Sequence, residues 1–261
     1  FEKPLALTTV EARKVMDLVR SSGVKAVVSH QHRYGAHYQK VKEVIASGAI
    51  GRVHTVYGHS TGWMGHMMTH LIDYMRWYND GADAEWVMAQ AAGRGKLADI
   101  HTSPDYLAGF IQFKNGVRGI IETGAGAPDV PEVDYWWRKC RIGAQGTEGF
   151  AETLTGGGWR AVTPNGVMSG EGCMNYDLDM PPYVADVAKW LDDDAAVHPC
   201  NAEEAYKGLE IMMGIMRSVV ERGQVARPLG DGPNELDELA KVLPEKPVLL
   251  SMEANRKEYP A

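Results

Sequence analysis

The feature that most constrains the fold of this chain is a series of strand-like segments along its middle. Each has the alternating or continuously apolar pattern of a β-strand, and short turn sequences separate most of them. Asn115-Gly116 between two alternating segments is typical of a tight hairpin, and Gly156-Gly157-Gly158 marks another reversal. Strands joined by such short turns pair antiparallel, so the sequence predicts one large, mostly antiparallel sheet. The predicted strands span residues 52–60, 85–92, 106–113, 116–123, 136–142, 149–154 and 159–163.

Helical patterns stand at both ends of this series and once within it. We expect these helices to cover one face of the sheet and to leave the other face open. An open apolar sheet face would be buried most simply by a second copy, so a homodimer or homotetramer formed through the sheet is expected. The predicted helices span residues 8–22, 35–47, 64–78, 182–193, 202–222 and 235–242.

The start of the chain has a different pattern. Helix 8–22 is followed by a short, continuously apolar segment, 24–29, of the kind that is buried on both faces of a parallel sheet. A βα unit needs a strand before its helix, and only a stub of one stands here. We therefore interpret residues 1–33 as the end of a larger α/β domain, 34–229 as an α+β sheet domain and 230–261 as a surface tail.

Composition excludes several classes of protein. The net charge of −7 disfavours nucleic acid and anionic membranes as partners. No apolar run approaches the length of a membrane span, and no secretory signal pattern is visible. Cys140, Cys173 and Cys200 are widely spaced, which favours free thiols over a zinc ribbon or a disulfide scaffold. We expect a cytoplasmic protein without nucleic-acid or membrane partners.

Helix 64–78 carries the most informative polar residues. In an α-helix, His66, His70, Asp73 and Trp77 would lie within a sector of roughly 60° on an otherwise apolar surface. These polar groups could simply be satisfied inside the core. Alternatively, His70 could act as a general acid or base facing a cleft. The spacing of His66 and His70 also permits a metal pair with a third ligand from elsewhere, although no metal is expected.

Two groups of residues follow the ends of strand patterns, where α/β proteins bind their ligands. Lys3 is held on a stiff backbone between Glu2 and Pro4. The run His30-Gln31-His32-Arg33 follows the apolar segment 24–29. Ordinary solvated side chains would explain either group, and a ligand-binding cleft would explain both.

Two further groups are candidates for binding a substrate. Tyr57 and His59 lie on the same face of strand 52–60. Trp137 and Arg138 place an aromatic surface beside a cation, which suits stacking on a sugar ring or packing at a subunit interface. We include all four among the substrate-binding candidates.

Four motifs in order along the chain resemble those of the Gfo/Idh/MocA oxidoreductases, which include glucose–fructose oxidoreductase and inositol dehydrogenases. The resemblance extends to about Leu229. Its motifs are Glu2-Lys3-Pro4-Leu5-Ala6, Gly48-Ala49-Ile50-Gly51-Arg52-Val53, His70-Leu71-Ile72-Asp73-x-x-Arg76-Trp77 and Gly146-Thr147-Glu148-Gly149.

The resemblance implies an N-terminal Rossmann domain that binds NAD or NADP, of which residues 1–33 would be the C-terminal remnant, and a sheet domain that holds a sugar. It also implies that Lys3 contacts the substrate hydroxyl, that His70 transfers the proton and that Asp73 is structural. His66 replaces the family's aspartate four residues before the histidine, and the glycine-rich dinucleotide loop is absent from the sequence. This chain alone is therefore not expected to bind a dinucleotide tightly.

The predicted function is NAD(P)-dependent oxidation of a sugar, sugar derivative or polyol at a ring hydroxyl. The alternatives are an oxidation-assisted lyase or glycosidase on the same fold, and a non-catalytic module for oligomerisation or binding. The predicted catalytic residues are Lys3, His66 and His70. The predicted substrate-binding residues are Arg33, Tyr57, His59, Asp73, Trp137 and Arg138, and the predicted cofactor-binding residues are Glu2, Lys3, Pro4, His30 and Gln31.

Overall fold

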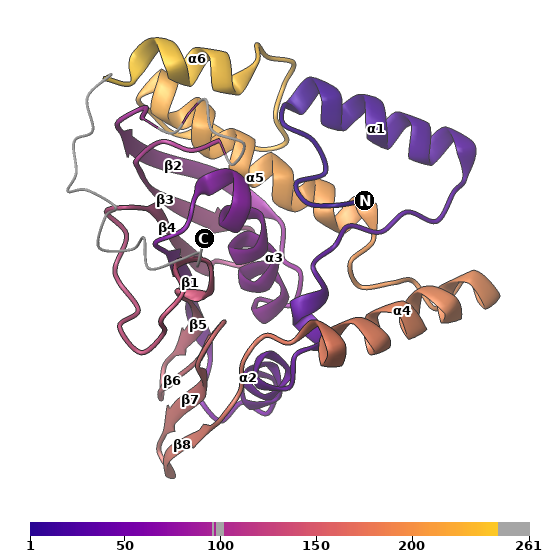
Figure 1. Ribbon diagram of the computed structural model, residues 1–261, viewed down its shortest axis with the longest axis vertical. Helices are drawn as coiled ribbons and strands as arrows, with labels where there is room; N and C mark the ends of the chain where they lie inside the picture. The colour runs from indigo at the N-terminus through magenta and orange to yellow at the C-terminus, as the bar shows by residue number, and fades with distance from the viewer. Residues whose placement is uncertain (96, 98–101, 245–261) are drawn as a thin grey trace, which may run out of the picture.

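The centre of the protein is a nine-stranded open sheet, seen in the computed structural model, which describes residues 1–95, 97 and 102–244 (Figure 1). The strands are β1 (Val53–Ser60), β2 (Ala84–Ala92), β3 (Tyr106–Phe113), β4 (Arg118–Gly124), β5 (Cys140–Gly146), β6 (Phe150–Leu154), β7 (Gly158–Thr163), β8 (Gly166–Gly170) and β9 (Val225–Ala226). Their order across the sheet is β8-β7-β6-β5-β1-β4-β3-β2-β9. The neighbours β1 and β4 run parallel and the other neighbours antiparallel, so the predicted sheet is confirmed.

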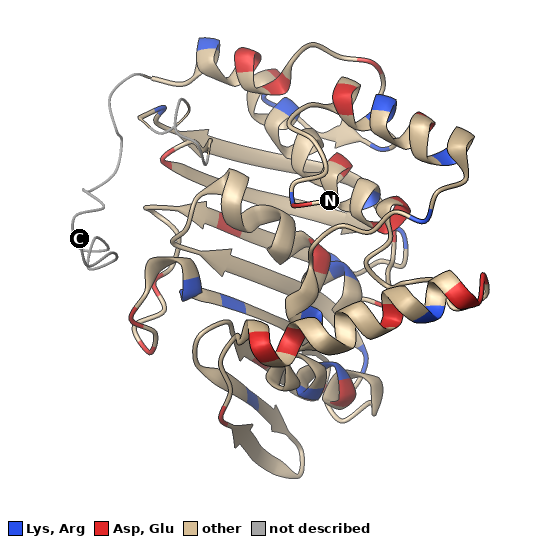
Figure 2. Cartoon of the chain, turned by 45° about the vertical axis from the view of Figure 1, so that its right-hand side comes forward, with Lys and Arg blue, Asp and Glu red and all other residues tan. Residues whose placement is uncertain are grey.

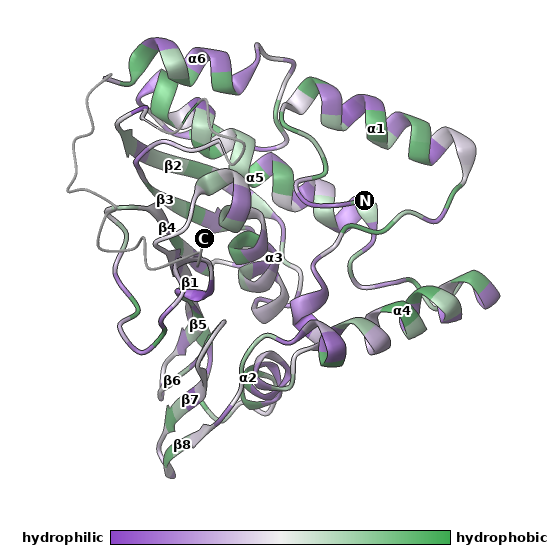
Figure 3. Ribbon diagram, in the orientation of Figure 1, coloured by the Kyte–Doolittle hydropathy of each residue, from purple (hydrophilic) through white to green (hydrophobic). Residues whose placement is uncertain are grey.

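Helices cover one face of this sheet. The helices α2 (Ala36–Ala46), α3 (Thr69–Tyr78) and α5 (Ala202–Glu221) pack on it, and green apolar colour runs along α5 and the neighbouring strands in Figure 3. The charged residues gather mainly on the outer helices and loops (Figure 2). The opposite sheet face exposes Met88, Phe110 and Ile120, which are direct cross-strand partners. One covered face and one open face match the expectation.

The first helix, α1 (Thr9–Ser22), confirms the predicted helix 8–22 and is capped at both ends. The Thr8 side chain accepts a hydrogen bond from the N–H of Glu11, and Gly23 ends the helix with φ at 68°. The predicted strand at 24–29 is wrong, because its only bridge joins Val27 to Asn201. The amino group of Phe1 donates to the Val27 carbonyl oxygen, and the Ser29 N–H donates to the Phe1 carbonyl oxygen. The two short segments therefore lie side by side without forming a regular strand.

The predicted helix 64–78 is two elements. Residues Met64–Met68 form a π-helical segment, η2, and α3 begins at Thr69. The wider π turn changes the angle between successive side chains before α3 begins, but the predicted stripe is divided within α3 itself. His66 and His70 still face one cavity, whereas Asp73 points behind it to Arg33.

Several other boundaries differ from the prediction. Residues Trp136–Arg138 form a 3-10 turn, η3, and not the start of a strand. Helix α4 (Tyr176–Asp192) begins before Pro181 and Pro182, because the Asn175 side chain caps its first turn. Strands β8 and β9 were not predicted, since neither has a clear alternating pattern. Arg222, not Gly223, takes the left-handed conformation that ends α5.

The predicted short helix at 235–242 is confirmed as α6 (Glu235–Val242). It packs against α5 with Leu239 fully buried, and its Glu235 carboxylate accepts a hydrogen bond of 2.9 Å from Arg217. Among the residues described, no helix has both the length and the apolar character that a membrane crossing requires.

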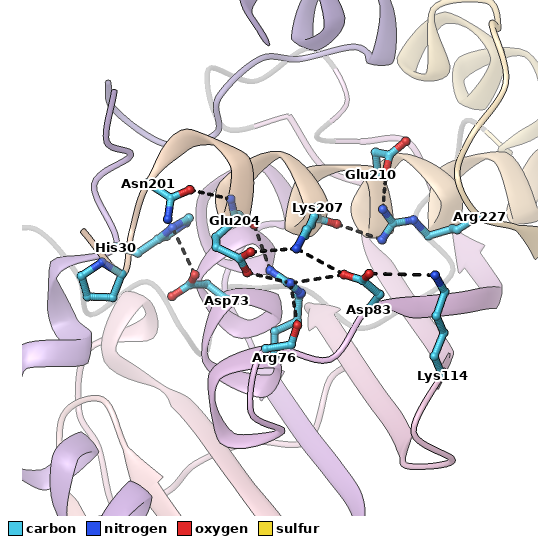
Figure 4. A network of polar contacts seen from close by, with 12 residues as sticks. His30, Asp73, Arg76, Asp83, Lys114, Asn201, Glu204, Lys207, Glu210 and Arg227 are labelled. Atoms are coloured by element: carbon cyan, nitrogen blue, oxygen red, sulfur yellow. Dashed lines mark hydrogen bonds and ion pairs between the residues drawn. The ribbon is translucent and has the colours of Figure 1, made fainter. Parts of the chain in front are cut away.

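A polar network around the buried Arg76 joins α3 to α5 and to Asp83, just before β2 (Figure 4). The Arg76 side chain is 1% exposed and donates to the Glu204 carboxylate at 2.8 Å and to the Gly81 carbonyl at 2.9 Å. Lys207 joins Glu204 to Asp83. Because burying a guanidinium without partners is costly, the bonds of Arg76 help to fix the position of the helix that carries His70.

Candidate functional site

A cavity of about 270 Å³ opens where four separate parts of the chain meet. These are the opening residues, the segment 29–38 that contains the 3-10 turn η1 (Gln31–Tyr34), the η2–α3 segment and the stretch from η3 to the start of α4. The cavity is lined by aromatic and polar side chains in a mixture that is typical of small-molecule sites. Of the predicted site residues, it is lined by Glu2, Lys3, Gln31, His66, His70 and Trp137.

Lys3 enters this cavity from the start of the chain. Its ammonium donates a hydrogen bond of 3.2 Å to the carbonyl oxygen of His66. Burial lowers the pKa of Lys3, and the nearby Glu2 carboxylate only partly opposes the shift. The amine is therefore easier to deprotonate than a solvated lysine, which suits proton transfer.

His70 lies on the first turn of α3 and is buried at the cavity wall. Its Nδ1 atom is 3.1 Å from the Tyr74 hydroxyl, one helical turn away, and its ring meets that of His30 edge-on at 5.3 Å. Desolvation lowers the pKa of His70 well below its usual value, and the neighbouring His30 and Lys3 lower it further. His70 is accordingly a neutral imidazole at physiological pH.

His66 precedes His70 on the π-helical segment and lines the same cavity. Its ring packs 5.6 Å from that of Trp136. Within the described chain no group of three or more His, Cys, Asp or Glu side chains is placed to hold a metal ion. The histidine pair thus lacks a third ligand there.

Arg33 and Asp73 lie beneath the cavity and do not line its wall. The Arg33 guanidinium donates two hydrogen bonds of 2.6 Å to the Asp73 carboxylate, and His30 Nδ1 lies 3.5 Å from the same group. Burial opposes ionisation of Asp73, but the charges of Arg33 and His30 prevail and lower its pKa. The buried pair joins η1 to α3 and so holds the two cavity walls together.

The structure places Tyr57 and His59 outside the cavity. Between them Gly58 faces Leu71 and Met75 of α3, so the two flanking side chains point to the open face of the sheet. There the Tyr57 hydroxyl donates a 2.6 Å hydrogen bond to Glu152. Side-chain alternation showed that the two share a face, but the sequence could not tell which face the cavity occupies.

The remaining predicted residues lie at the edges of the site. The Arg138 guanidinium stacks 4.5 Å from the ring centre of Trp137, which lines the cavity. Pro4 and His30 line a small space behind the main cavity and do not reach it. Arg138 is therefore positioned to support the aromatic wall.

Several cavity residues were missed by the sequence prediction. His32 is bound by Asp179, and Tyr38 is hydrogen-bonded to Thr155 at 2.5 Å. The run from His30 to Arg33 had marked the right segment but not which histidine faces inward. Tyr74 could have been found from its position one helical turn after His70.

A neighbouring buried histidine makes stability sensitive to acid. Burial lowers the pKa of His37 to about 4, although the Asp179 carboxylate opposes the shift. The unfolded chain takes up this proton below about pH 6.5, so the free energy of unfolding falls as the pH drops from there toward 4. At pH 5 the loss amounts to about 2 kcal/mol.

We expect His37→Leu to remove this part of the acid sensitivity, measured as the difference between urea unfolding free energies at pH 7 and at pH 5. The variant His54→Leu is the control, since His54 lies on β1 away from this site. An unchanged pH difference in His37→Leu would contradict the assignment.

Residues 38–152 match the model of the GFO/IDH/MocA C-terminal domain. The chain is 30% identical over 136 residues to 1,5-anhydro-D-fructose reductase of Ensifer adhaerens, a match that covers 44% of this chain and 40% of the reductase. A second curated relative is matched over 13% of its length. The chain thus spans less than half of these curated relatives.

Solved structures share the fold. Levoglucosan dehydrogenase, in complex with NADH and levoglucosan, superimposes with a TM-score of 0.70 at 20% identity, over 87% of this chain and 73% of that one. The super-repressor mutant of Gal80p from Saccharomyces cerevisiae gives 0.69 at 13% identity, over 86% and 70%. The matched domain, the relatives and the fold agree with the family that the four motifs resemble, and the match to the family model covers residues 38–152.

Proposed function

We propose that this chain is the substrate-binding part of an NAD(P)-dependent oxidoreductase that acts on a ring hydroxyl of a sugar, sugar derivative or polyol. The observation that carries the proposal is the convergence of Lys3 and His70 on one cavity. The residues lie far apart in sequence, and each has its pKa lowered by burial. An amine and an imidazole that share a cavity and both have lowered pKa values are suited to transferring the proton of a hydroxyl group.

The described residues do not form a complete binding site for the proposed cofactor. In them no glycine-rich turn joins a buried strand to a helix N-terminus, which is the cradle that a pyrophosphate needs. We propose that residues 1–33 complete a dinucleotide-binding domain whose other residues hold NAD or NADP. In this division, residues 34–229 form the substrate domain and 230–261 the C-terminal segment.

The chain's own residues account for the proton chemistry. A nicotinamide cofactor would supply the hydride acceptor. Lys3 would take the hydroxyl proton from the substrate, and the neutral His70 would orient the same hydroxyl by a hydrogen bond. Trp137 would provide an apolar surface for the sugar ring.

Incubation of the full-length protein with NAD⁺ or NADP⁺ and a panel of sugars and polyols tests the proposal. We expect nicotinamide absorbance to rise with at least one of them. The shared fold of the Gal80p super-repressor favours a second candidate, a binding module without catalysis. Ligand binding without turnover of any substrate would favour that module.

The proposal includes a homodimer or larger homo-oligomer formed through the open sheet face. Phe110 is 51% exposed between Met88 and Ile120, and these three adjoin Tyr57 across the sheet. We expect Phe110→Asp to shift the mass measured by light scattering toward that of the monomer, because a carboxylate would be buried in the contact. Glu43→Lys on α2 is the control, and an unchanged mass in Phe110→Asp would contradict the interface.

A cytoplasmic location is also part of the proposal. It is supported by Cys140, Cys173 and Cys200, which are all free thiols. Cell fractionation with a compartment marker would test it.

A further inference from the structure

His32 forms a hydrogen-bonded pair with a carboxylate at the cavity. Its Nδ1 atom lies 2.9 Å from Oδ2 of Asp179, and both side chains are almost fully buried. His32 comes from η1 and Asp179 from the first turn of α4, so the pair joins two walls of the cavity. The carboxylate accepts the Nδ1 proton and thereby leaves the lone pair on Nε2.

His70 has the same arrangement on the neighbouring wall. Its Nδ1 atom is engaged by the Tyr74 hydroxyl at 3.1 Å. Both histidines line the cavity, and within the described chain neither Nε2 atom makes a hydrogen bond. Their ring centres are 5.8 Å apart.

A purely structural histidine in this protein looks different. His198 is fully buried, and both of its ring nitrogens are used, one by the Cys200 N–H at 3.0 Å and one by the Tyr183 carbonyl oxygen at 3.2 Å. His32 and His70 each use one nitrogen to fix the ring and keep the other for the cavity. This pattern is that of imidazoles oriented to meet a ligand.

We propose that the cavity recognises a vicinal diol, with one hydroxyl bound by Nε2 of His70 and the hydroxyl on the neighbouring carbon bound by Nε2 of His32. Asp179 is the positioning residue that fixes the tautomer of His32. Hydrogen bonds of about 2.8 Å from two rings at this separation reach oxygen atoms close enough to belong to adjacent carbons. The proposal rests on the proposed function, which supplies a polyhydroxylated ligand, and it narrows the substrate class.

The site's charges agree with a neutral diol. Lys3 and Glu2, which also line the cavity, have opposite signs, and Asp179 is already engaged by His32. Trp137 and Tyr176 add aromatic surface, with the Tyr176 ring 5.3 Å from that of His32. Aromatic faces beside a few directed hydrogen bonds are suited to the alternating apolar and hydroxylated surfaces of a sugar ring.

Calorimetric titration of the full-length protein with myo-inositol, D-glucose and the monodeoxy derivatives of D-glucose tests the proposal. We expect His32→Phe to weaken binding of the best ligand about tenfold, as expected for loss of one well-formed hydrogen bond. His32→Gln, whose amide reaches a similar position, should recover part of the affinity. Asp179→Asn should weaken binding in the wild-type background and have no further effect together with His32→Phe.

The decisive comparison combines a ligand change with a protein change. A monodeoxy sugar that lacks the hydroxyl bound by His32 should bind the wild type and His32→Phe equally well, which loss of local structure would not produce. His54→Phe on β1 is the matched control, and thermal unfolding checks that each variant is folded.

If every sugar binds His32→Phe as tightly as the wild type, the diol proposal is overturned and the proposed function stands. If the wild type neither binds nor oxidises any polyol, both are overturned.

Discussion

Replacing Lys3 by methionine in the full-length protein should lower kcat for its sugar substrate by about 10²–10⁴-fold, the usual contribution of a general acid or base. Methionine fills a similar space but can neither take nor give a proton. Within the described part of the chain the Lys3 side chain makes one hydrogen bond, to the backbone of His66, so the thermal unfolding temperature should change little. The measurement is the initial rate of nicotinamide reduction at saturating substrate.

The partner residue gives a stricter test of a shared site. His70→Asn should also reduce kcat, and the double variant Lys3→Met/His70→Asn should lose less than the product of the two single effects, because both act on the same hydroxyl. Lys40→Met on the exposed side of α2 serves as the control. Strictly independent effects, or a Lys3→Met variant with wild-type turnover, would show that the two groups do not share a reacting hydroxyl.

The second large effect is expected at Asp73 and is one of stability. Asp73→Ala removes the carboxylate that binds Arg33 and leaves a guanidinium buried without its counter-ion. Breaking a buried ion pair on one side costs about 3–5 kcal/mol. Urea unfolding followed by tryptophan fluorescence should therefore show a much lower midpoint.

An exposed ion pair provides the control. Lys40 and Glu43 on α2 are 2.8 Å apart with about half of each side chain in solvent, so Glu43→Ala should leave the midpoint unchanged. The Asp73 carboxyl, with its lowered pKa, adds stability that is present above about pH 3.9 and is lost as the pH falls through the folded-state pKa. Asp73→Ala should lack this acid-induced loss, and a wild-type midpoint in that variant would contradict the buried pair.

Local sequence patterns were sufficient to predict those turns and helices whose structure depends on residues close in sequence. The Asn115-Gly116 turn joins β3 and β4 with Gly116 at a φ of 84°, a conformation that glycine adopts without strain. The bounds of α1 and α6 followed almost equally well from the pattern of side chains within a few turns. The π turn at Met64–Met68 was not predictable in this way, because the contacts that accompany it come from Thr102 and Ser103, which are distant in sequence.

Sequence patterns predicted the sheet and its helical cover, and they pointed to Lys3 and His70, which line one cavity. Alternating apolar residues and turn residues determine local structure over a few positions, and the motifs contain the side chains of Lys3 and His70. Which polar residues meet depends on the tertiary structure. It brought His32 and Asp179 to the cavity, placed Arg33 and Asp73 beneath it and turned Tyr57 and His59 to the opposite face. Burial and charge pairing between distant segments depend on how the helices pack on the sheet, and no short stretch of sequence contains that information.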